Sequence, residues 1–178
     1  MADDAIKAEE FVKFYKAVSQ IDPELKKALR KHLMSKVAPI VEEVRQAALA
    51  IPSNREVGGT RKKKGQTLGL RASLAAAAKA DFNGTGRGAV VHIRISKTRF
   101  QAVSGKENRS LPHYMEGRRK RPWRHPVFGN KEVWVEQSSH PFLGVTVWKN
   151  QDKFIKGVSD SVEETIQALD TAMKTINP

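Results

Sequence analysis

Apolar residues recur at helical spacing near both ends of the chain. Intervals of three and four residues predict an amphipathic helix over residues 6–20, a long second helix up to about Ile51, and a C-terminal helix from Gln151 to Ile176. Asp22, Pro23 and Glu24 predict the start of the second helix, because they supply an N-cap, a proline in the first turn and a negative charge near the helix N-terminus. The apolar positions are Phe11, Phe14, Tyr15 and Val18, then Leu25, Leu29, Leu33, Val37, Val41, Val44 and Ala48, and finally Phe154, Val158, Val162, Ile166, Leu169, Met173 and Ile176.

Shorter elements are predicted between these helices. Leucines and alanines predict a short helix over residues 67–80, followed by a turn over 81–88. Alternating or β-branched residues predict strands over 89–95, 98–103, 132–136 and 144–148, and residues 111–115 fit one helical turn. The expected class is α+β, with an antiparallel sheet of about four strands flanked by a long N-terminal helix and a C-terminal helix.

The length of the chain suits a single domain over residues 1–178. We divide it into N-terminal helices (1–51), a basic loop (52–66), a helix with the antiparallel sheet (67–150) and a C-terminal helix (151–178). A second basic loop spans residues 104–125. No apolar run is long enough to span a membrane, the acidic N-terminus does not resemble a secretory signal, and the absence of cysteine excludes disulfides.

The net charge of +13 is concentrated in the middle of the chain. Residues 51–125 contain 18 Lys and Arg against four Asp and Glu. A positive field of this size attracts nucleic acid or acidic protein surfaces, although basic loops can also serve only solubility. The candidate interaction residues form two basic runs: Arg61, Lys62, Lys63 and Lys64, and Arg118, Arg119, Lys120 and Arg121.

The stretch Leu111–Phe142 has the most distinctive composition. Pro122 and Pro126 each remove a backbone donor, which argues against a helix or a central strand there, and Gly129 and Asn130 favour a turn. Trp134 and Trp148 are expected to fill the core. Trp123 could stack on bases or pack against the corner at residues 126–128, and we favour packing. The structural motif consists of Trp123, Arg124, His125, Pro126, Phe128, Gly129 and Trp134.

This stretch resembles the neck, or tail-completion, proteins of long-tailed bacteriophages. The similarity lies in the pattern GRxxRPWRHPVFGN…WVxQ…HPF, at Leu111–Pro112, Gly117, Trp123–Asn130, Trp134–Val135, Gln137 and Pro141–Phe142. The resemblance implies a structural virion protein made in the host cytoplasm. It would form a ring of identical subunits, a hexamer or a dodecamer, at the head–tail junction around the DNA channel, in the neck, tail-completion or tail-terminator layer. Its partners would be other connector and tail proteins, with possible non-specific contact to channel DNA and none with membranes.

No residue pattern points to catalysis or to a cofactor. The five histidines lack the cysteine or carboxylate partners and the close spacing of a zinc site. The sequence GTGRG at residues 84–88 lacks the Lys-Ser/Thr of a phosphate-binding loop. We therefore expect no enzyme activity, cofactor or metal. The alternative to a connector subunit is a sequence-independent nucleic-acid-binding protein, which the charge alone supports.

Overall fold

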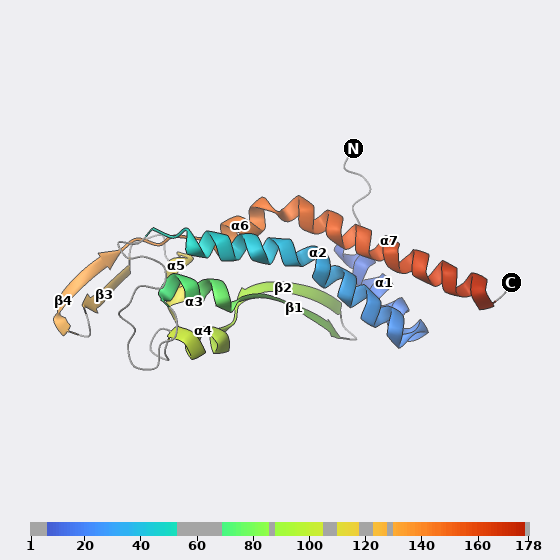
Figure 1. The fold of residues 1–178 in the computed structure, drawn as a ribbon, viewed down its shortest axis with the longest axis horizontal. Helices are drawn as coiled ribbons and strands as arrows, with labels where there is room; N and C mark the ends of the chain where they lie inside the picture. Colours follow the sequence, from blue (N-terminus) through green and yellow to red (C-terminus); the bar gives the residue numbers. More distant parts are fainter. Residues whose placement is uncertain are drawn as a thin grey trace. The chain divides into compact units, whose positions relative to one another are not determined.

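The computed structural model describes residues 7–52, 69–85, 88–104, 110–117, 123–127 and 130–176, and these residues form an α+β protein, as expected (Figure 1). The predicted positions of the first, second and last helices and of the strand at 89–95 are confirmed. The described elements are α1 (Ala8–Ile21), α2 (Pro23–Leu49), α3 (Leu70–Ala77), β1 (Ala78–Thr85), β2 (Gly88–Ile95), α4 (Lys97–Ser104), α5 (Leu111–Met115), β3 (Trp123–Val127), β4 (Asn130–Gln137), α6 (Leu143–Lys149) and α7 (Gln151–Ile176).

The predicted single sheet of about four strands is wrong for the described residues. Their strands form two separate two-stranded sheets, β1 with β2 and β3 with β4. Two expected strands, at 98–103 and 144–148, are the helices α4 and α6. The expected helix over 67–80 ends at Ala77, and β1 occupies most of the expected turn that follows. Only two residues join β1 to β2, so these strands run antiparallel.

The chain divides into two compact units, each made of segments that are distant in sequence. The terminal unit comprises Met1–Val41, Ala80–Ile93 and Lys149–Pro178, and the central unit comprises Glu42–Lys79 and Arg94–Trp148.

The core of the terminal unit lies between α1, α2, the β1–β2 hairpin and α7. The backbone N–H of Glu24 donates to the Asp22 carboxylate over 2.8 Å, which confirms the expected cap at the start of α2. Leu29 and Leu33 are fully buried on the inner face of α2. The buried cluster consists of Phe11, Tyr15, Leu29, Leu33, Ala89 and Val162, with Phe14, Phe82 and Val158 packed against it.

Helix α7 approaches α2 through small residues. A Cβ atom built on Gly157 would lie 2.9 Å from the Cβ of Lys36, so only glycine fits this contact. Ser161 and Thr165 follow one and two turns later and are fully buried. Their hydroxyls donate to the carbonyls of Gly157 and Ser161 over 2.7 and 2.8 Å. These buried hydroxyls are therefore satisfied within α7, and the two backbones can pack closely.

Replacing Gly84 with alanine is expected to destabilise the protein by about 1–3 kcal/mol through overpacking. The new methyl group would meet the ring of Tyr15, whose Cε1 lies 2.8 Å from the Cβ position. Tyr15 is buried and has its ring edge-on to Phe82, which leaves it little room to move. Urea denaturation checks this, with exposed Asn83→Ala as the control. Equal stabilities of the two variants would show that the Tyr15 ring moves aside without loss of stability.

The central unit is organised around α3 and α4. Leu74 on α3 and Phe100 on α4 are fully buried. The Arg71 guanidinium donates to the carbonyl of Leu49 over 3.4 Å and to that of Ile51 over 3.2 Å. These bonds satisfy carbonyls at the C-terminal end of α2 that have no partner within the helix. Arg71 thereby fixes the end of α2 to α3.

Candidate interaction surfaces

Several of the sequence-predicted site residues lie outside the described residues. These are both basic runs, Arg61–Lys64 and Arg118–Arg121, together with Phe128 and Gly129. The interaction roles of the basic runs and the structural roles of Phe128 and Gly129 stay predictions. The backbones of Trp123, Arg124, His125 and Pro126 belong to β3, and Trp134 belongs to β4.

Strands β3 and β4 form an antiparallel hairpin, which we call the arm. Arg124 pairs with Glu136, and Pro126 pairs with Trp134. The register then shifts between Pro126 and Val127, where Val127 pairs with Asn130. In a two-stranded sheet both strands are edges, so β3 accommodates a proline that a central strand would exclude. The interruption coincides with the corner predicted at residues 126–128.

The arm exposes an aromatic residue that we expected in the core. The side chain of Trp134 is 48% exposed and that of the neighbouring Val133 is 50% exposed. Arg124 and Glu136 are exposed as well, and their cross-strand pairing places opposite charges at one level of the arm. The prediction that Trp134 fills the core is therefore wrong, because a two-stranded arm has too little surface to enclose it.

Helix α6 is held at its N-terminus by a carboxylate from a distant segment. Glu116 Oε1 accepts hydrogen bonds from the backbone N–H groups of Phe142 at 3.0 Å and Leu143 at 2.7 Å, and Oε2 accepts one from Gly144 at 2.9 Å. The first N–H groups of a helix lack partners within it, so one side chain here satisfies three of them. Gly117 turns the chain next to this cap with a φ of 72°, which favours glycine.

Once capped, α6 presents apolar side chains to solvent. None of its residues is buried, and Trp148 is 76% exposed, so the prediction that Trp148 fills the core is also wrong. Val145 lies one turn earlier and is mostly exposed too. Trp148 and Val145 share a helix face because they are three residues apart. The local pattern of residues 144–148 predicts a strand, so the sequence gives no sign of this helical surface.

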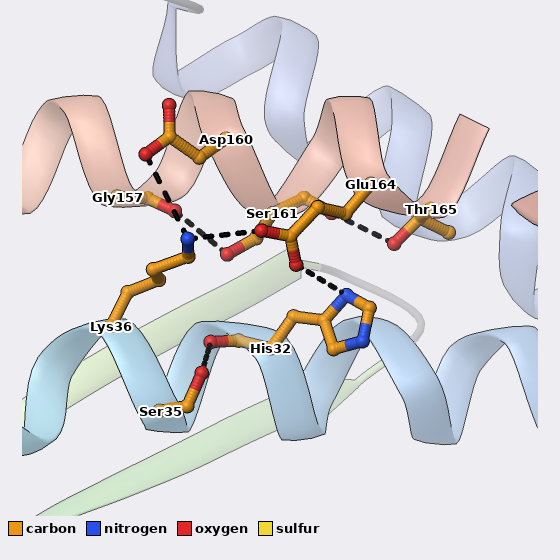
Figure 2. Close-up of polar contacts among 8 residues, drawn as sticks. All are labelled: His32, Ser35, Lys36, Gly157, Asp160, Ser161, Glu164 and Thr165. Carbon is orange, nitrogen blue, oxygen red and sulfur yellow. Dashed lines mark hydrogen bonds and ion pairs between the residues drawn. The ribbon is translucent and has the colours of Figure 1, made fainter. Parts of the chain in front are cut away.

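In the terminal unit, a polar cluster joins α2 to α7 (Figure 2). Lys36 Nζ lies 2.9 Å from Glu164 Oε1 and 3.9 Å from the carboxylate of Asp160. His32 Nδ1 lies 2.9 Å from Glu164 Oε2, but its geometry does not meet that of a hydrogen bond. The cluster fixes the register between the two helices with a pair of partly exposed charges.

The pKa values of Lys36 and Glu164 reflect their pairing. The hydrogen bond to Glu164 raises the pKa of Lys36 above its usual 10.5, and the hydrogen bond from Lys36 lowers the pKa of Glu164 below its usual 4.5. The carboxylate therefore contributes stability above pH 4.5 that is lost as the pH falls through its lowered pKa. The ammonium contributes stability below pH 10.5 that is lost as the pH rises through its raised pKa.

Replacing Glu164 with glutamine is expected to lower stability most between pH 4.5 and 10.5, where both charges are present. The difference from wild type should shrink on either side of that window. Urea midpoints measured across the pH range test this. Glu163→Gln is the matched control, because no ion pair to the exposed Glu163 is found within the described ranges. A pH-independent difference between wild type and the Glu164 variant would contradict the role of the pair.

The described residues contain no group of three or more His, Asp and Glu arranged to hold a metal ion. Within the same ranges, no helix has the length and hydropathy needed to cross a bilayer.

Comparison of the chain with protein-family models, with curated proteins and with solved structures gives no match.

Proposed function

We propose that this chain is a structural subunit of a phage head-to-tail connector, which assembles as a ring that joins head to tail around the DNA channel. The proposal rests on the resemblance of Leu111–Phe142 to neck and tail-completion proteins. The structural feature that supports it best is the exposure of two tryptophans, Trp134 on the arm and Trp148 on α6. Tryptophan is among the residues most enriched at the energetic centres of protein interfaces.

The ring would place the basic residues of every subunit around a common axis. The runs Arg61–Lys64 and Arg118–Arg121 are proposed to contact channel DNA or an acidic neighbouring protein. Contacts of lysine and arginine with phosphate carry no base readout, so binding would be independent of sequence and would weaken with salt. Repetition around the ring would strengthen a modest local attraction. The proposal assigns the chain no catalytic role.

Two measurements test this proposal. The mass of the purified protein, alone and with a portal or tail-tube protein, should show a closed assembly. Replacing Arg61, Lys62, Lys63 and Lys64 with glutamine should leave the melting temperature unchanged and reduce assembly or DNA retention in particles. A protein that stays monomeric with every connector partner would refute the ring. The matching glutamine variant of Arg118, Arg119, Lys120 and Arg121 tests the second basic run. Infectious, DNA-retaining particles at normal yield from both variants, alone and combined, would refute the role of the basic runs.

A second function is favoured by the exposed arm. Trp134 and Arg124 are both exposed on it, and an aromatic with a nearby cation is a common means of binding single-stranded nucleic acid. On this alternative, unrelated single-stranded oligonucleotides should bind with similar affinity, and binding should fall steeply as salt is raised. Trp134→Ala should then weaken binding with little loss of stability. Absence of binding at low salt would exclude the alternative.

A further inference from the structure

The second half of α7 continues beyond the core of the terminal unit. Thr165 is the last described residue of the helix that is buried. From Ile166 to Lys174 every side chain is exposed except Leu169, which is half-buried. We call residues 166–174 the α7 extension. Helices in proteins owe most of their stability to packing of an apolar face, so an exposed helix end with such a face suggests that a partner covers it.

The α7 extension has an apolar stripe with charged residues along one edge. Ile166, Leu169 and Met173 are separated by three and four residues, the spacing of helices that pack side by side. Ile166 is 49% and Met173 is 64% exposed. Asp170 lies beside this stripe and pairs with Lys174 over 2.6 Å. Glu163 lies on the same side, just before the extension, and is exposed with no ion-pair partner among the described residues. The stripe continues the face that carries buried Val162 and therefore extends an apolar surface past the end of the core.

An oppositely charged surface lies where α1 meets α2. Ile21, the last residue of α1, is 65% exposed. Lys27, Arg30 and Lys31 lie within one exposed turn of α2. Within the described residues, Arg30 and Lys31 have no ion-pair partner, whereas Lys27 lies 3.5 Å from Glu24. We call these four residues the α1–α2 corner. It offers an apolar side chain beside a basic helix face.

We propose that the α7 extension of one subunit docks on the α1–α2 corner of the next subunit in the ring. This inference rests on the proposed ring. A second copy fits because Glu163, the carboxylate beside the stripe that has no ion-pair partner among the described residues, complements the basic face of the α1–α2 corner, and each copy carries both surfaces. Contacts between two different surfaces of identical subunits repeat head to tail and can close a ring. Pairing of two α7 extensions would instead bring the Glu163 carboxylates of both copies close to each other.

The first test alters the stripe. Ile166→Asp with Met173→Asp should abolish assembly and leave a folded monomer, because both side chains are exposed in the single subunit. The control is Gln167→Asp with Thr171→Asp, which adds the same charge to another side of the same helix and should assemble as wild type. Circular dichroism melting checks that both variants fold. Normal assembly of the stripe variant (Ile166→Asp with Met173→Asp), or an equal loss of assembly in the control, would overturn the proposal.

The second test mixes complementary defects. Arg30→Glu with Lys31→Glu should also give a folded monomer, now with an intact α7 extension but a defective α1–α2 corner. Mixed in equal amounts with the stripe variant, it should form dimers that grow no further, because only one intact pair of surfaces remains. Native mass spectrometry distinguishes these species. A mixture that stays monomeric, or that forms full rings, would overturn the head-to-tail pairing.

Ring formation by the wild-type protein distinguishes failure of the docking inference from failure of the proposed function on which it rests. If wild type forms rings and both double variants do as well, the connector proposal stands and the docking site lies elsewhere. If wild type forms no ring under conditions that include its connector partners, the proposed function fails and the docking inference fails with it.

Discussion

Replacing Phe100 with alanine is expected to lower the free energy of unfolding by about 3–5 kcal/mol. Phe100 is the largest fully buried side chain among the described residues, and it lies on the inner side of α4. Its removal would leave a cavity against α3 that the surrounding helices can fill only in part. The loss would be a large fraction of the stability of an ordinary domain. Urea denaturation with circular dichroism measures it.

The control for Phe100 is Thr98→Ala on the same helix. Thr98 is exposed, so its replacement should change stability by no more than about 0.5 kcal/mol. A Phe100→Ala variant as stable as the control would place the ring outside the core and contradict the packing of α4 on α3.

Replacing Glu116 with alanine is expected to cost about 2–3 kcal/mol and to release α6. The carboxylate accepts three backbone N–H bonds at 2.7–3.0 Å, and hydrogen bonds to a charged group are each worth about 1.5–3 kcal/mol when the donors cannot find equal partners. Water can reach part of this exposed helix, so the three bonds will not add in full. Hydrogen exchange at the amides of Phe142, Leu143 and Gly144 should accelerate.

Two further variants distinguish the loss of the α6 cap from the general effect of removing a negative charge. Glu116→Gln keeps one oxygen acceptor but loses the negative charge, so its effect should be intermediate. Glu136→Ala removes an exposed carboxylate from the arm and should leave exchange in α6 unchanged. If Glu116→Ala left the exchange of all three amides as slow as in wild type, the carboxylate would not be what holds α6.

Elements whose own residues decide their structure could be predicted from the sequence. Helix α7 has the predicted bounds, because its apolar stripe and its length leave no competing structure. The start of α2 was predicted because Asp22 caps it from two residues away. Strand β2 was predicted because its apolar and polar residues alternate.

Elements that depend on distant residues could not be predicted. Residues 144–148 read as a strand, since three of five are valine or threonine, yet they form α6 under the cap from Glu116. That cap comes from 26 to 28 residues away, so no local pattern contains it. In α4, the fully buried Phe100 packs the helix against its neighbours, whereas the local pattern of residues 98–103 predicts a strand.

The candidate surfaces were only partly predictable for a related reason. The composition identifies Trp134 and Trp148 as notable, and we assigned them to the core because large aromatics usually lie there. Exposure depends on whether other elements cover the residue, and periodicity does not report that. The basic runs stood out because a cluster of like charges is visible without knowing the fold.

The order of segments in the terminal unit has a consequence for synthesis of the protein. This unit joins Met1–Val41 to Lys149–Pro178, and the pairing of Lys36 with Glu164 depends on a segment that is translated after the central unit. During translation, α1 and α2 therefore cannot complete the core of the terminal unit until α7 has been synthesised. All segments of the central unit have been synthesised by then. Contacts between the two ends also carry a high loop-closure cost, which slows folding. A nascent chain that stops at residue 148 should accordingly hold Leu29 and Leu33 in an incomplete core, a state that chaperones recognise by its exposed apolar surface.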